Sequence, residues 1–145
     1  MAAKQAVLVE SMRPLSGGAK HKRAYQNAVA AAACQAQVPR LASRRLYSKV
    51  YYFHRGRSTI DADNLSKPTL DALTGLAYED DAQIVLRVAA KIDLDTDNYE
   101  FPVNRLGSHQ FDKLLMLLSS AEARVDVLYV EVGEVGSFPL NLGVW

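Results

Sequence analysis

Seven segments of this 145-residue chain carry a regular pattern of apolar and polar positions. Four of them are rich in β-branched and aromatic residues and predict strands at about residues 4–10, 46–53, 83–94 and 125–132. Three have apolar residues at helical spacing and predict helices at about residues 24–37, 66–76 and 110–123. The predicted fold class is α/β (α+β): a single compact domain over residues 1–145, with a small mixed β-sheet flanked by helices.

Proline positions set the expected limits of the helices. A residue that precedes proline avoids the helical conformation, so the first helix is expected to end before Pro39. Proline is tolerated best in the first turn of a helix, so the second helix is expected to begin just before Pro68. The residues ahead of it are then extended or turning, and Asp61 and Asp63 are expected to point to the same side.

Composition limits the class of protein. The chain is 49% apolar, which is enough for a buried core at this length. The single cysteine, Cys34, excludes an intrachain disulfide, and its Ala-rich surroundings favour a small apolar side chain on a helix over a reactive thiol. The chain shows neither a signal-peptide pattern at its start nor an apolar run near the roughly 20 residues that cross a bilayer. We therefore expect a soluble, cytoplasmic protein with no membrane contact.

Charge is distributed unevenly, although the formal net charge is only +1. Residues 1–60 hold 11 Lys and Arg and one acid, whereas residues 61–145 hold six Lys and Arg and 15 acids. A basic surface of this kind is typical of nucleic-acid binding. The two halves can also interleave over an ordinary solvated surface, and the sequence leaves both alternatives open.

Acidic residues cluster on both sides of the second predicted helix. Asp61 and Asp63 precede it, and Glu79, Asp80 and Asp81 follow it. Carboxylates are the ligands that Mg²⁺ prefers, and they repel one another when they are gathered without a cation. If the return connection brings the two pairs together, they form a metal site. The alternative is that the first pair only caps or turns the chain and that the second lies in a solvated loop.

A lysine lies within this acidic region. Lys67 follows Asp63 by four residues and precedes Asp71 by four. On a helix Lys67 and Asp71 share a face, where the lysine can neutralise a phosphate or stabilise a leaving oxygen. The alternative is an exposed ion pair that contributes a few tenths of a kcal/mol.

The segment from Asp61 to Ile84 reads D-A-D-N-L-S-K-P-T-L-D-A-L-T-G-L-A-Y-E-D-D-A-Q-I. It resembles the signature of the RusA family of crossover-junction endonucleases, in which D-x-D-N-L-x-K is followed by a helix with D-A-L and then by D-D-x-Q-[IV]. The match covers 24 contiguous residues with several fixed spacings. The resemblance implies a RusA-like fold and the resolution of Holliday junctions.

The resemblance also implies roles for individual residues. The three metal-site aspartates of the family correspond to Asp61, Asp63 and Asp81, and its functional lysine corresponds to Lys67. The supporting positions are Asn64, Asp71, Asp80 and Gln83. The implied cofactor is Mg²⁺, with Mn²⁺ as a substitute and no small-molecule cofactor. The implied assembly is a homodimer that binds a four-way DNA junction and makes paired nicks in strands of like polarity.

The similarity is weaker outside this segment. Three uncharged residues, 58–60, separate the basic residues near position 55 from the first aspartate, the region between Lys91 and Val125 carries an extra helix, and the tail from Gly136 is additional. These differences concern dimer geometry and junction preference more than hydrolysis. The candidates for phosphate contacts are Lys20, Lys22, Arg23, Arg40, Arg44, Arg45, Arg55 and Arg57.

The implied mechanism is metal-dependent phosphodiester hydrolysis. The metal is expected to polarise the scissile phosphate and to lower the pKa of the attacking water, while Lys67 stabilises the charge of the transition state. The predicted function is a structure-specific endodeoxyribonuclease of DNA recombination and repair. Two alternatives stay open: an inactive protein that binds branched DNA, and a metal-dependent nuclease that prefers forks, flaps or duplex DNA.

Overall fold

The computed structural model describes residues 5–15, 18–101, 108–137, 140 and 142–143. The strands in this part of the chain are β1 (Gln5–Ser11), β2 (Leu46–Arg55), β3 (Ile84–Asp93) and β4 (Val125–Glu134). The α-helices are α1 (Gly18–Gln35), α2 (Ala62–Leu73) and α3 (His109–Leu118). A short 3₁₀-helix, η1 (Asp81–Gln83), precedes β3. The predicted mixed α/β class is confirmed.

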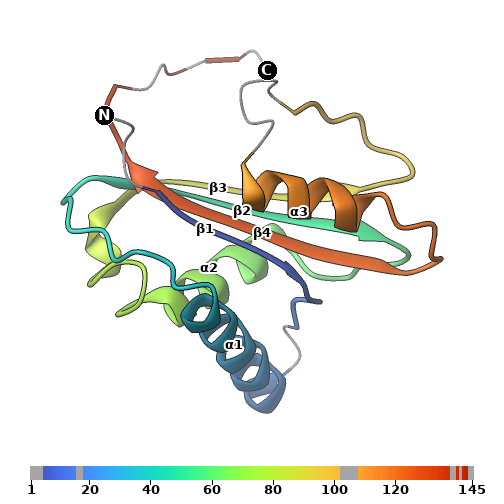
Figure 1. Cartoon of the computed structure of the whole chain (residues 1–145), viewed down its shortest axis with the longest axis horizontal. Helices are drawn as coiled ribbons and strands as arrows, with labels where there is room; N and C mark the ends of the chain where they lie inside the picture. Colours follow the sequence, from blue (N-terminus) through green and yellow to red (C-terminus); the bar gives the residue numbers. More distant parts are fainter. Residues whose placement is uncertain (1–4, 16–17, 102–107, 138–139, 141, 144–145) are drawn as a thin grey trace.

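The four strands form one mixed sheet with the order β1-β4-β2-β3. β4 is antiparallel to both β1 and β2, whereas β2 and β3 are parallel and are connected through α2. Figure 1 shows α1 and α2 on one face of the sheet and α3 on the other. α2 therefore belongs to a βαβ unit at one edge of the sheet, where it runs back from the end of β2 toward the start of β3.

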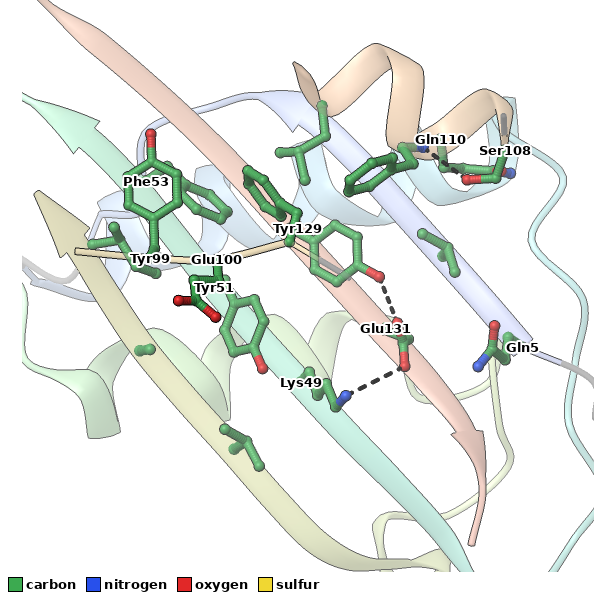
Figure 2. Close-up of a pocket in the computed structure, with 17 residues that line it drawn as sticks. Gln5, Lys49, Tyr51, Phe53, Tyr99, Glu100, Ser108, Gln110, Tyr129 and Glu131 are labelled. Carbon is green, nitrogen blue, oxygen red and sulfur yellow. Dashed lines mark hydrogen bonds and ion pairs between the residues drawn. The ribbon is translucent and has the colours of Figure 1, made fainter. Parts of the chain in front are cut away.

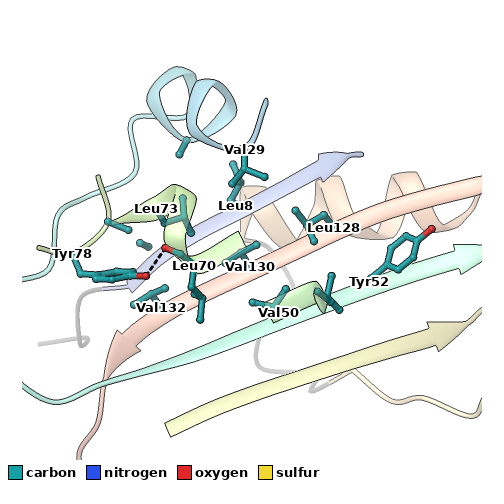
Figure 3. Close-up of a cluster of buried hydrophobic side chains, with 14 of the residues drawn as sticks. Leu8, Val29, Val50, Tyr52, Leu70, Leu73, Tyr78, Leu128, Val130 and Val132 are labelled. Carbon is teal, nitrogen blue, oxygen red and sulfur yellow. Dashed lines mark hydrogen bonds between the residues drawn. The ribbon is translucent and has the colours of Figure 1, made fainter. Parts of the chain in front are cut away.

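Most of the core lies between the sheet and the α1/α2 layer (Figure 3). Val50 of β2, Val29 of α1 and Leu70 of α2 are each at most 1% exposed there. Because alternate strand residues face opposite sides, Phe53 of β2 points to the other face, where it belongs to a second cluster with Phe111 of α3. The larger core fixes α2, and with it the acidic segment, on the sheet.

α2 begins earlier than the proline rule predicts. Its first residue is Ala62, Asp61 occupies the extended N-cap position, and Pro68 lies inside the helix. The proline has no N–H to donate to the carbonyl of Asn64, so the helix lacks one hydrogen bond there. The apolar side chains that α2 buries in the core outweigh this loss. The prediction that residues 61–64 are extended or turning ahead of the helix is therefore wrong from Ala62 onward.

The other helices differ from their predictions at the ends. α1 begins six residues earlier than predicted, so the basic residues 20–23 form its first turns. α3 ends at Leu118 instead of residue 123. Cys34 lies on α1 as expected but is exposed, because the buried side of that helix is formed by Tyr25, Val29 and Ala33. None of the helices in the described ranges is long and apolar enough to cross a membrane.

Candidate active site

One side of α2 is polar and exposed. Asp63, Lys67 and Asp71 follow one another at intervals of four residues and are all exposed, so they form a line along the outer side of the helix. The opposite side buries Leu65 and Leu70, which are at most 1% exposed. The apolar side fixes the helix on the sheet, and the charged groups face solvent.

Asp61 stands at the start of this line. It has extended backbone angles, φ −82° and ψ 153°, and its side chain makes no cap hydrogen bond. An N-cap aspartate ordinarily accepts a hydrogen bond from a backbone N–H of the first turn. The alternative that the Asp61 side chain only caps the helix is therefore not supported, and its exposed carboxylate remains available to a ligand.

Lys67 forms the ion pair that helical spacing predicts. Its Nζ lies 3.6 Å from Oδ2 of Asp71, and the two side chains are 66% and 36% exposed. An exposed pair of this kind contributes only about 0.3–0.5 kcal/mol. Because it is weak and solvated, a phosphate can replace Asp71 as the partner of the lysine at little cost.

Asp80 caps the turn that carries Asp81. Its side chain accepts a hydrogen bond of 3.0 Å from the backbone N–H of Ala82, and this bond holds the pKa of Asp80 below its usual range. A hydrogen bond with the side chain of Asp81 lowers the same pKa further. Asp80 therefore supports the turn, while Asp81 occupies the first position of η1 and is exposed.

Gln83 ties this turn to the segment that precedes β2. Its side-chain oxygen accepts hydrogen bonds from the backbone N–H groups of Glu79 and Asp80, at 2.8 and 2.9 Å. Its side-chain nitrogen donates to the carbonyl groups of Leu41 and Ser43, at 3.3 and 2.8 Å. The second acidic pair is thereby fixed at the start of β2.

The two acidic pairs lie at opposite ends of α2. The Tyr78 hydroxyl donates a 2.5 Å hydrogen bond to the carbonyl of Leu70, which places the connection after α2 beside the last turns of the helix. Asp61 lies at the other end, and 12 helical residues span about 18 Å. Among the described residues no group of three or more His, Cys, Asp and Glu is placed to hold a metal ion. The expectation that the return connection unites the pairs is not met within one chain.

Asp81 instead shares its surroundings with Asp71. Burial raises the pKa of the Tyr78 hydroxyl, and the charges of Asp71 and Asp81 raise it further. The side-chain hydrogen bond of Tyr78 with Thr74 and the charge of Arg87 oppose this rise. Two carboxylates and one guanidinium therefore act on the same hydroxyl at the C-terminal end of α2.

The aspartates match a divalent cation in chemistry but not in position. Carboxylate oxygens are the donors that Mg²⁺ and Mn²⁺ prefer, so Asp61, Asp63 and Asp81 suit such an ion. Within a single chain α2 separates Asp81 from the other two. A three-carboxylate site therefore needs more than one copy of the chain or a rearrangement.

Most of the predicted phosphate-binding residues are exposed. Arg55 differs: its guanidinium donates to Oδ1 of Asp95 at 3.1 Å and to the carbonyls of Ser120 and Glu122 at 2.6 and 3.1 Å. This arginine joins the loop after β3 to the segment before β4 and is engaged within the protein. The exposed members of the set are Lys20, Lys22, Arg23, Arg40, Arg44, Arg45 and Arg57.

A cavity of about 480 Å³ lies on the other face of the sheet, beside α3 (Figure 2). Its lining includes the aromatic residues Tyr51, Phe53 and Tyr129. Glu131, only 2% exposed, also borders it, and its Oε2 lies 4.0 Å from Nζ of Lys49. The sequence alone does not predict this cavity, although alternation along β2 and β4 places these side chains on one face.

The buried carboxylate of Glu131 has several partners. The Tyr129 hydroxyl donates to its Oε1 at 2.5 Å, and the Tyr47 hydroxyl donates to its Oε2. Gly133 makes room for this arrangement, because a Cβ at that position would lie 2.6 Å from Oη of Tyr47. Gln5 in turn donates to the Tyr47 hydroxyl at 2.9 Å. The acid is thus part of an internal network that holds β1, β2 and β4 together.

Comparison with known proteins identifies the family of the chain. A search of curated proteins finds no significant match. The family model of endodeoxyribonuclease RusA matches residues 16–100, a range that contains α1, β2, α2 and β3. The three predicted metal-site aspartates and Lys67 all lie within it. The chain therefore belongs to the RusA family of endodeoxyribonucleases.

Proposed function

We propose that this protein is a structure-specific endodeoxyribonuclease that resolves four-way DNA junctions, with Asp61, Asp63 and Asp81 as metal-binding carboxylates. The observation that carries the proposal is that a chain of this family keeps these three aspartates exposed. The Asp61 side chain makes no hydrogen bond to the N-terminus of the helix that it precedes. Carboxylates that contribute so little to the fold are suited to binding a ligand.

The cofactor in this proposal is Mg²⁺, for which Mn²⁺ can substitute. When bound, the ion would supply positive charge beside the scissile phosphate and the attacking water. Lys67 would hold a phosphate oxygen, because its pair with Asp71 is weak and solvated. Asp80 and Gln83 would keep Asp81 in position through the capped turn.

The active unit in this proposal is a homodimer with composite sites. In one chain Asp81 lies about a helix length from Asp61 and Asp63, so a single copy does not gather the three carboxylates. A second copy can bring its Asp81 to the Asp61/Asp63 end of the first, and twofold symmetry then creates two equal sites. Two equal sites suit the paired nicks that junction resolution requires.

The experiment that tests the function compares substrates. Purified protein is incubated with a synthetic four-way junction, a fork, a flap and a plain duplex, each with and without Mg²⁺. We expect paired nicks in the junction only with the metal, and slower cleavage of the other three substrates. Junction binding without nicking in the presence of Mg²⁺ would support the inactive DNA-binding alternative, and preferred cleavage of forks, flaps or duplex would support the other nuclease.

A further inference from the structure

β3 is an edge strand that carries two cations on the α2 side of the sheet. In the parallel register, Arg87 pairs with Ser48 and Lys91 with Tyr52. Tyr52 belongs to the core beneath α1 and α2, and Ser48 points to the same side because residues of a strand alternate. Paired residues of neighbouring strands share a face, so Arg87 and Lys91 also face the side on which α2 lies.

Both cations are accessible. Arg87 and Lys91 are exposed, although α2 packs against the same strand. Among the residues that the structure describes, neither forms an ion pair with a carboxylate. Arg55, by contrast, donates from Nε to Asp95 and from Nη1 to two carbonyl groups. In the described part of the chain, the edge strand thus presents two exposed cations that no direct ion pair engages.

These cations lie along the acidic segment. Arg87 is four residues beyond η1 and acts, with Asp71 and Asp81, on the hydroxyl of Tyr78. Lys91 lies four residues further, about 13 Å along the strand and toward the end of β2 from which the chain leads to Asp61. The two positions therefore follow α2 from its C-terminal end toward its N-terminal end.

We propose that Arg87 and Lys91 bind the phosphate backbone of the DNA strand that lies along α2, and that Lys67 completes this row of cations. The inference rests on the proposed function and adds residues that the family signature does not contain. A phosphodiester strand fits the row because its charges repeat every 3.4 Å along the axis, so a 13 Å row can reach separate phosphates of one strand. The contacts involve no base edge and supply affinity and orientation without sequence preference.

The test is the salt dependence of junction binding, measured without divalent metal so that no cleavage occurs. Each phosphate contact adds about 0.9 to the slope of log K against log salt, which is a factor of about 3.5 between 50 and 200 mM salt. In the wild type the binding constant falls by some factor between 50 and 200 mM salt. This fall is expected to be about 3.5-fold smaller in each of the single variants Arg87→Gln and Lys91→Gln, and about 12-fold smaller in the double variant. Arg87→Lys is expected to keep the slope of the wild type.

Lys113→Gln is the matched control. Lys113 lies on α3, on the opposite face of the sheet, and pairs with Glu10 at 3.2 Å. This variant changes the net charge by the same amount and is expected to keep the slope of the wild type. Melting curves of all variants show whether each is folded. The melting temperatures of Arg87→Gln and Lys91→Gln are expected to stay at the wild-type value, because both side chains are exposed.

A wild-type slope in the folded double variant would overturn the inference, as would an equal loss in the Lys113 control. Failure of the wild type to nick the four-way junction in Mg²⁺ would count against the proposed function instead. The two failures are therefore distinguishable, because one is read from binding titrations and the other from the cleavage assay. Under cleavage conditions the double variant is expected to raise KM more than it lowers kcat, because binding to phosphates outside the scissile bond is equal in ground and transition states.

Discussion

The two faces of the sheet hold their acidic residues in opposite ways. On the α2 face Asp63 and Asp81 are exposed, and the cluster around them has only weak, solvated ion pairing. On the α3 face Glu131 is 2% exposed and receives two tyrosine hydroxyls and a lysine. A buried carboxylate is tolerated only with such partners, whereas an exposed one contributes little to stability. The comparison distinguishes acids available for chemistry from an acid required by the fold.

The largest expected effect is a loss of junction cleavage when the exposed aspartates of the α2 face are changed. Asp63→Asn and Asp81→Asn each keep the size of the side chain and remove the charge that would hold the cation. We expect junction cleavage to fall by about 10³-fold while junction binding and the melting temperature stay at wild-type values. Gel assays of nicking and binding, beside a melting curve, measure all three. Glu134→Gln, an exposed change on β4, serves as the control with full activity, and wild-type nicking by either aspartate variant would contradict the assignment.

The opposite result is expected on the α3 face. Glu131→Ala removes the carboxylate that accepts hydrogen bonds from the Tyr47 and Tyr129 hydroxyls and that lies beside the Lys49 ammonium. We expect a loss of about 3 kcal/mol in the free energy of unfolding, with unchanged cleavage per folded molecule. Urea denaturation measures the free energy of unfolding. A cleavage assay normalised to the concentration of folded protein measures the activity per folded molecule. Loss of cleavage at full stability would remove the distinction between the faces.

Two buried hydroxyl groups on the α2 side of the sheet differ in their hydrogen bonding. Ser48 is fully buried and its hydroxyl has no hydrogen-bond partner among the described residues, whereas the Thr69 hydroxyl bonds to Tyr25 at 2.6 Å and to the Leu65 carbonyl at 2.7 Å. We expect Ser48→Ala to raise the free energy of unfolding by about 1 kcal/mol and Thr69→Val to lower it by about 1–2 kcal/mol. Denaturant titrations at neutral pH compare them, and equal changes of the same sign would contradict the difference in partners.

The last expected effect is confined to alkaline pH. Burial raises the pKa of Tyr25 to about 12, although its hydrogen bond with Thr69 lowers it. Because the folded-state pKa lies above the unfolded value of 10.0, the contribution is complete below pH 10 and is lost as pH rises to about 12. Tyr25→Phe should flatten that part of the stability profile while losing stability at pH 7. If the free energy of unfolding of Tyr25→Phe falls with pH above 10 as steeply as that of the wild type, the Tyr25 hydroxyl is not the group responsible.

Much of the fold follows from local pattern. The β-branched and aromatic segments gave all four strands within a few residues, because alternation and turn residues act locally. The start of α2 did not follow, because local pattern shows the cost of Pro68 inside the helix but not the burial of Leu65, Leu70 and Leu73 in the core, which outweighs it. Strand order was not predictable either, since β4 pairs with β1 and β2 across most of the chain.

The candidate site was only partly predictable. The motif gave the aspartates and Lys67, and the ion pair of Lys67 with Asp71 follows from helical spacing. The separation of Asp61 from Asp81 depends on the direction of α2 relative to the sheet, which spacing does not contain. The network around Glu131 depends on strand register in the same way.

Subunit mixing tests most directly whether the carboxylates at the two ends of α2 act as one site. Asp63→Asn and Asp81→Asn proteins, each inactive alone, are mixed, allowed to exchange subunits and assayed on a junction. If the sites are composite, each mixed dimer has one intact site, and nicking returns. Mixing wild type with the Asp63→Asn/Asp81→Asn double variant gives mixed dimers with no intact site. No recovery in the first mixture, with one active site per mixed dimer in the second, would contradict the account.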